Sequence, residues 1–384
     1  MTHVAASVPV LRWAARRARK TDEALCQRFT KWPQWLSGEA QPTLRQLEDF
    51  AQFTHTGIGY FFLPEPPSEP LPLPDFRTLR DHELAEPSSE LLDTIHLCQR
   101  RQDWYREHAR LNGWPPLPFV GSLSVQTTPV EAAQKIRQTI QLSTEARRHL
   151  STWEAALRQL IALIEDSGVL VMASAVVGSN SHRKLDVGEF RGFTLADDLA
   201  PVIFLNTADS KAAQMFTLGH ELAHVWLGQS GVSDPEAGQM PRHQTERWCN
   251  LVAAELLVPM AELKTAYQPG TPIPDEMQRL ARSFKVSTLV ILRRLFDAGH
   301  LDESGLWHHY RQEQDRLQEI MQQRKGSGGD FYRSLAVRAS KRFSRALISS
   351  TLEGGTLFRD AFQMLGIRSS RTFHKTAREL SVAP

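Results

Sequence analysis

The stretch TLGHELAHVWLG, residues 217–228, constrains the chain more than any other. Its apolar flanks predict a buried helix, and a helix places residues i and i+4 on one face. His220 and His224 can therefore converge on one Zn²⁺ ion. Glu221, directly after the first histidine, can take a proton from a water molecule that the metal activates. The motif predicts two metal ligands and the general base of a hydrolase.

A third ligand is needed, because zinc hydrolases usually bind the metal through three protein side chains. The next predicted helix, HQTERWCNLVAAELLVP, carries Glu246, Cys249 and Asn250 along one stripe. Glu246 is the best oxygen donor and would leave a fourth position open for water. Asn250 is placed to hydrogen-bond a ligand histidine. Cys249 is the rival, either as a thiolate ligand that closes a structural site or as a small core residue.

The alternative to a metal site is a buried helix in which two histidines only pack. The chain has 14 histidines, and composition alone would produce H-E-x-x-H in roughly 3% of such chains. The position inside a helix, the apolar flanks and the acid-bearing helix that follows all favour the metal site.

The chain resembles the ImmA/IrrE family of zinc metallopeptidases over roughly residues 155–300. The resemblance is carried by FTLGHELAHVWL and TERWCNLVAAELLVP. Cys249 stands where alanine is usual in that family, and Val252 where phenylalanine is usual. The resemblance implies a gluzincin-like fold with Glu246 as third zinc ligand and Glu221 as base. It also implies that a peptide substrate adds along an exposed strand edge, for which PVIFLN and its neighbours are candidates.

Residues 8–62 are similar to the Xre-type helix-turn-helix domain, through W-x-S-G-E-x-x-P-T at 35–43. The stretch from Leu25 to Trp35 is about four residues shorter than usual, roughly one helical turn. A shortened recognition helix presents fewer side chains to a major groove. Lys31 and Gln34 are the expected DNA contacts, and a protein-interaction or sensing role is the alternative. Because such domains often pair, a homodimer is one expectation.

The apolar pattern predicts a mostly helical α+β fold. A small three-strand sheet is expected from VLVMAS, EFRGFTLA and PVIFLN, preceded by the all-α helix-turn-helix domain. KGSGGD, residues 325–330, is expected to be a flexible joint. The expected segments are the Xre-like domain at 1–62, a Pro-rich linker at 63–87, a helical connector at 88–154, the zinc metallopeptidase domain at 155–324 and a basic C-terminal helical extension at 325–384.

Composition predicts a cytoplasmic protein with no membrane contact. The formal net charge is +2 and 41% of residues are apolar, as in ordinary globular proteins. Three distant cysteines without CxxC suit a reducing compartment, and no run of 18 apolar residues is present. Ten Lys and Arg side chains lie between Arg333 and Arg378, which makes this segment a second candidate for DNA contact.

Members of the resembled family commonly cleave a helix-turn-helix repressor. The resemblance therefore implies a zinc-dependent endopeptidase that cleaves a regulatory protein, in a stress-response or mobile-element and defence setting. The alternative is a non-catalytic DNA-binding regulator or an antitoxin-like protein, in which the zinc domain is a sensing or structural module.

Overall fold

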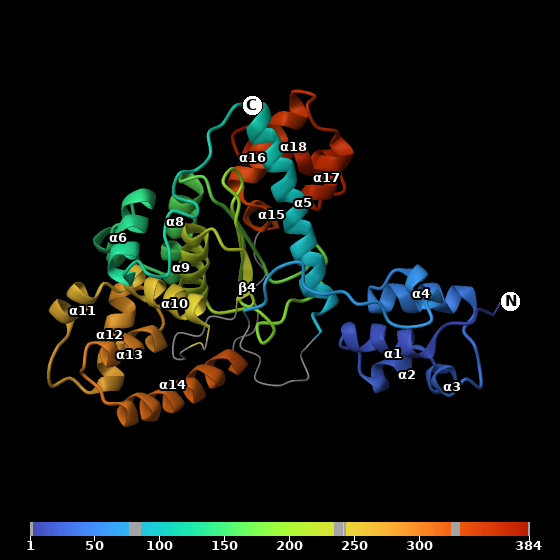
Figure 1. Cartoon of the computed structure of the whole chain (residues 1–384), viewed down its shortest axis with the longest axis horizontal. Coiled ribbons are helices and arrows are strands. Elements are labelled where there is room, and N and C mark those ends of the chain that lie inside the picture. Colours follow the sequence, from blue (N-terminus) through green and yellow to red (C-terminus); the bar gives the residue numbers. More distant parts are fainter. Residues whose placement is uncertain (1–2, 77–85, 234–240, 242, 324–330, 383–384) are drawn as a thin grey trace. The chain divides into compact units, whose positions relative to one another are not determined.

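The computed structural model describes residues 3–76, 86–233, 241, 243–323 and 331–382 (Figure 1). They form a mostly helical α+β protein with one small sheet, as the sequence predicts. The chain divides into two compact units. Unit 1 comprises Met1–Pro72 with Leu79–His96, and unit 2 comprises Leu73–Thr78 with Leu97–Pro384. The predicted joint at 325–330 lies outside the described residues.

Unit 1 begins with short helices whose ends are fixed by capping residues. The Thr21 side chain caps the second helix, and Gly38, with φ of 78°, ends the third in the left-handed region. Thr43 and Gln46 form a capping box at the fourth. The elements are α1 (Val8–Arg17), α2 (Asp22–Arg28), α3 (Trp32–Ser37), α4 (Leu44–Thr54) and the 3₁₀ helix η1 (Ile58–Phe62).

Aromatic rings fill the core of these helices. Trp32 stacks on Phe50 with ring centroids 5.3 Å apart, and Trp35 meets the same ring edge-on at 6.2 Å. Because α3 has six residues and buries both tryptophans, its outer face is short. Lys31 and Gln34 are both exposed, and their contact with DNA stays a prediction.

The linker region after η1 holds no helix between residues 63 and 76, in line with its prolines. Helix α5 (Ser89–Leu111) then forms as predicted. Three helices lie between residues 129 and 166, because Gln141 adopts a positive φ of 54° and Ser143 and Thr152 each start a new helix with a side-chain cap. These are α6 (Pro129–Ile140), α7 (Thr144–Arg148) and α8 (Trp153–Asp166).

The sheet has four strands in the order β1-β3-β2-β4. The three predicted strands are confirmed as β1 (Leu170–Ser174), β2 (Gly192–Leu195) and β3 (Val202–Asn206). β1 and β3 are parallel and the other pairs antiparallel. The expected three-strand sheet lacks the fourth strand, β4 (Gly231–Ser233). Its three residues are too few to show the alternation of apolar and polar side chains that predicts a strand. PVIFLN is also not an edge: β3 lies between β1 and β2.

Helices cover both faces of the sheet, so β1 and β3 are buried along their whole length. Val171 and Ile203 share one core cluster with α8 and with α9 (Lys211–Leu227). Met172, which points to the other face, contacts Arg101 of α5. In the part of the chain that is described, no helix has the length and apolar character needed to cross a bilayer.

The helices after the sheet complete unit 2. α9 packs against α10 (Gln244–Leu257), and Gly219 faces Ala253 at this contact. The helix Ile273–Phe284 ends at Lys285, which has a φ of 56°. The further helices are α11 (Met260–Ala266), α12 (Ile273–Phe284), α13 (Thr288–Asp297) and α14 (Glu303–Gln323).

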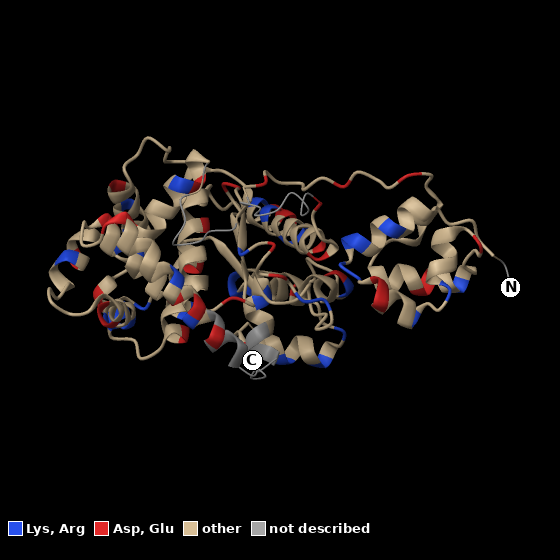
Figure 2. Cartoon of the chain, turned by 90° about the horizontal axis from the view of Figure 1, so that it is seen from below, with Lys and Arg blue, Asp and Glu red and all other residues tan. Residues whose placement is uncertain are grey.

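The C-terminal segment packs against the sheet through α15 (Phe331–Ala339), which contacts β1. Some arginines of this segment form hydrogen bonds within the protein. Arg342 donates to the hydroxyl of Tyr105 at 2.7 Å, and Arg345 donates to the carbonyl of Leu380 at 3.2 Å. Figure 2 shows Lys and Arg on many helices with Asp and Glu among them. The remaining helices are α16 (Lys341–Leu352), α17 (Phe358–Leu365) and α18 (Ser370–Glu379).

Arginines fix the C-terminal end of α10. The last carbonyls of a helix lack partners within the helix and form the negative end of its dipole. Arg137 donates to the carbonyl of Glu255, Arg147 to that of Leu257, and Arg294 to that of Val258. Arg294 also forms an ion pair with the Glu255 side chain, in which both side chains are less than 10% exposed. This end anchors the helix that carries Glu246.

Replacing Arg294 with methionine is expected to lower the free energy of unfolding by about 3–5 kcal/mol, because it leaves the Glu255 carboxylate buried without its partner. Chemical denaturation measures the loss. Arg110→Met is the matched control, since the Arg110–Glu107 pair is more than half exposed and such a pair contributes about 1 kcal/mol or less. Equal effects of the two substitutions would contradict the anchoring role.

Candidate metal centre

Helix α9 places the H-E-x-x-H side chains in the interior. The helix starts at the Ser210 cap and ends at Gly228, which has a φ of 66°. His220, Glu221 and His224 are all 0% exposed. The Nε2 atoms of the two histidines lie 3.1 Å apart, so the predicted convergence of the imidazoles is present.

Glu246 of α10 faces both histidines. Its Oε2 lies 3.1 Å from Nε2 of His220, and its Oε1 lies 2.9 Å from Nε2 of His224. Burial raises the pKa of this carboxyl, but the two histidines more than offset that and hold the pKa at about 2. The structure thus places a carboxylate against the imidazole pair.

Asn250, one turn further along α10, orients His220. Its Oδ1 lies 2.8 Å from Nδ1 of His220. When Nδ1 donates to this oxygen, Nε2 keeps its lone pair and directs it towards His224 and Glu246. The amide therefore sets the tautomer in which His220 can bind a metal.

The chemistry of this donor set fits zinc. Two ligands at tetrahedral zinc, each about 2.0–2.1 Å from the ion, lie about 3.3 Å apart, close to the observed separations of 2.9–3.1 Å. Two imidazole lone pairs that face each other repel unless a cation or proton lies between them. Glu221 Oε1 and His224 Nδ1 are also buried without a hydrogen-bond partner among the described residues.

Cys249 lies at the same centre. Its Sγ and one ring nitrogen each of His220 and His224 lie within 4.8 Å of one another, which makes these three buried residues a group that can hold a metal ion. Burial raises the pKa of the thiol well above its ordinary value, so it is protonated unless a cation displaces the proton. Both third ligands weighed from the sequence, Glu246 and Cys249, are therefore near the histidines.

Strand β2 supplies two residues that sequence reasoning missed. The hydroxyl of Thr194 donates to Oε2 of Glu221 at 2.8 Å. Gly192 makes room for the same carboxylate, because a Cβ there would lie 2.9 Å from Oε1 of Glu221 and 3.0 Å from the carbonyl oxygen of Phe204. Burial raises the pKa of Glu221 against the pull of both histidines. The sequence predicts a strand at GFTL, but Thr194 is 27 positions from Glu221, and no sequence pattern connects the two residues.

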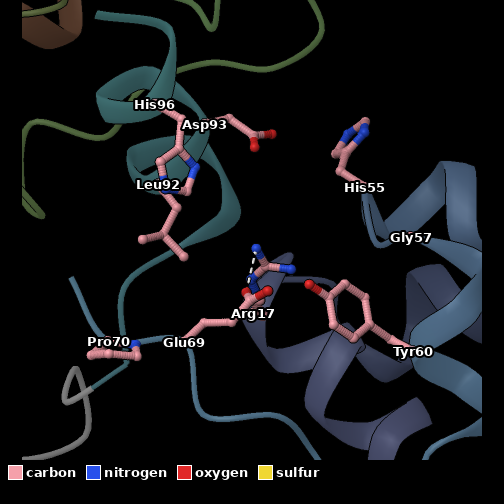
Figure 3. A pocket seen from close by; sticks show the side chains of 9 residues that line it. All are labelled: Arg17, His55, Gly57, Tyr60, Glu69, Pro70, Leu92, Asp93 and His96. Carbon is pink, nitrogen blue, oxygen red and sulfur yellow. Dashed lines mark ion pairs between the residues drawn. The ribbon is translucent and has the colours of Figure 1, made fainter. Parts of the chain in front are cut away.

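Unit 1 contains a separate pocket of about 390 Å³. Figure 3 shows the Arg17–Glu69 ion pair inside it, with Tyr60 beside the carboxylate. The ion pair measures 2.7 Å, and hydrogen bonding to Glu69 raises the pKa of the Tyr60 hydroxyl. The other lining residues are His55, Gly57, Pro70, Leu92, Asp93 and His96.

A motif helix and an acid-bearing helix packed beside a small mixed sheet define a metallopeptidase-like domain. Residues 164–296 match the family model described as the IrrE N-terminal-like domain (Peptidase_M78). Unit 2 therefore carries an IrrE N-terminal-like domain, which confirms the resemblance over most of the predicted span. Residues 339–379 match a domain of unknown function, DUF8813. No curated protein matches the chain. Neither family match covers residues 8–62, and the helix-turn-helix assignment stays a prediction.

Proposed function

We propose that the chain is a zinc-dependent endopeptidase that acts in the cytoplasm and cleaves a regulatory protein, such as a helix-turn-helix repressor. The observation that carries the proposal is the position of the Glu221 carboxylate beside the buried His220, His224 and Glu246 side chains. The family match to a peptidase domain supports it. A stress-response or mobile-element and defence setting is part of the proposal.

His220, His224 and Glu246 would hold the metal, and Asn250 would fix the His220 tautomer. Zinc, when bound there, supplies a Lewis acid that activates water and polarises the scissile carbonyl. Glu221 takes up the proton of the attacking water and passes it to the leaving amine. The hydrogen bond from the Thr194 hydroxyl to Oε2 of Glu221 holds the carboxylate in place for this work.

Coexpression with the protein encoded by the adjacent gene tests the proposal. We expect the wild-type chain to cut this protein into defined fragments and Glu221→Gln to leave it whole. Mass spectrometry of the fragments gives the cleaved bond. The same pattern of fragments from both chains would trace the cleavage to a host protease and contradict the proposal.

Thr194 is expected to position the base. Thr194→Val keeps the shape of the side chain but removes the donor to Glu221, and an unmade hydrogen bond to a buried group costs about 1–3 kcal/mol. The cleavage rate should fall roughly fivefold to a hundredfold, with zinc content unchanged. Thr194→Ser should restore most of the rate. Equal activity of the valine and serine variants would remove Thr194 from this role.

Cys249 favours a second candidate function, in which zinc is structural and the chain regulates transcription without cleavage. A thiolate ligand would close the position that a hydrolase keeps open. In that case DNA would bind through residues 8–62 or the basic C-terminal segment, in a homodimer. Zinc content separates the two functions: loss of zinc in Cys249→Ala with retention in Glu246→Gln would support the structural site, and the reverse supports the peptidase.

A further inference from the structure

A three-residue segment of the proline-rich linker lies along β4. The carbonyl of Pro74 accepts a hydrogen bond from the backbone N–H of Val232 at 3.0 Å, and the N–H of Phe76 donates to the carbonyl of Val232 at 3.0 Å. Asp75 stands opposite Val232 in parallel register. Residues 74–76, which we name the strap, thus extend the sheet beyond its edge strand.

The strap brings an aromatic ring to the metal centre. The Phe76 ring stacks on His224 with centroids 5.7 Å apart and planes 15° apart, and its centroid lies 5.0 Å from that of His243. Gly231 admits the ring, because a Cβ there would lie 2.3 Å from Cε2 of Phe76. Any other residue at 231 would force the ring to move.

The strap covers the centre on the side of His224. His220, Glu221 and His224 are 0% exposed and Glu246 is 3% exposed, yet hydrolysis of a protein requires contact between the scissile bond and these groups. The peptide bond to be cut can reach them only if a covering group moves. Phe76 is such a group: its ring contacts His224, and two backbone hydrogen bonds, one of them from its own N–H, hold the strap at the sheet edge.

We propose that the strap is an intramolecular competitor of the protein substrate, which occupies the edge of β4 and keeps the centre closed until an extended segment of the substrate displaces it. A strand edge offers backbone groups to any extended peptide. The position that Phe76 fills beside Gly231 and His224 selects a substrate with an aromatic side chain there. This inference rests on the proposed function for the identity of the displacing partner.

The rate at which EDTA removes zinc from the loaded full-length protein tests the cover without an activity assay. Phe76→Ala should lose zinc roughly threefold to tenfold faster than wild type, as expected when one aromatic contact is lost. Phe76→Trp should stay near the wild-type rate. Phe62→Ala is the matched control, because Phe62 is 53% exposed and lies in unit 1. Equal zinc content and equal melting temperature before EDTA is added show that the site itself is intact.

A peptide supplied in trans tests the competition for the edge of β4. LPLPDF, residues 71–76, should slow zinc loss from Phe76→Ala, and LPLPDA should not. Cleavage of the partner protein should be faster in Phe76→Ala than in wild type. An unchanged rate of zinc loss in Phe76→Ala overturns the strap whatever the cleavage assay shows. Faster zinc loss without cleavage by any variant overturns the proposed function and leaves the cover in place.

Discussion

Glu221→Gln is expected to abolish cleavage while zinc stays bound. Glutamine has nearly the same size, and the three proposed ligands remain. It cannot take up a proton, and a positioned general base contributes about 10²–10⁴-fold to a rate. The cleavage rate of the partner protein and the zinc content, measured on the same preparation, give both halves of the result.

Glu154→Gln is the matched control for this substitution, because Glu154 is exposed on α8 and should tolerate the change. If Glu221→Gln cleaves as fast as wild type, Glu221 is not the base. If it loses zinc as well as activity, the carboxylate holds the metal, and the assignment of roles between Glu221 and Glu246 is wrong.

His224→Ala is expected to remove the metal. The imidazole is 0% exposed and its Nε2 faces both His220 and Glu246, so the substitution removes one of the three proposed ligands. The loss of zinc affinity should exceed the roughly 10–100-fold that follows loss of an outer hydrogen-bonding partner. Metal analysis after dialysis against a defined zinc buffer measures it.

His308→Ala is the comparison for His224→Ala, because His308 is an exposed histidine outside the centre. Zinc content should not change in it. A His224→Ala protein that keeps wild-type zinc content would exclude this histidine from the ligand set and leave the binding site elsewhere.

Local signals in the sequence were enough to predict the motif helix, the helix that carries Glu246, and the starts of capped helices in unit 1. The i, i+4 spacing of His220 and His224 depends only on helix geometry, and the caps at Thr21 and Thr43 are short-range hydrogen bonds. The stripe on α10 predicted that Glu246 and Asn250 share a face, and both meet His220.

Contacts between residues far apart in the chain could not be predicted from the sequence. Thr194 reaches Glu221 across 27 positions, and no periodicity links the two. β4 is three residues long, too short for alternation to identify a strand. The order of the strands placed PVIFLN inside the sheet, because pairing depends on the fold of the whole unit. The strap was not predicted either, because a proline-rich segment is typical of a linker and not of a strand.

The nature of the third ligand tests the central claim most directly. X-ray absorption spectroscopy of the zinc-loaded protein measures the distances from the metal to its ligand atoms. Coordination by His220, His224 and Glu246 predicts only nitrogen and oxygen neighbours, at about 2.0–2.2 Å. A sulfur neighbour at about 2.3 Å would place Cys249 on the metal and contradict the peptidase account.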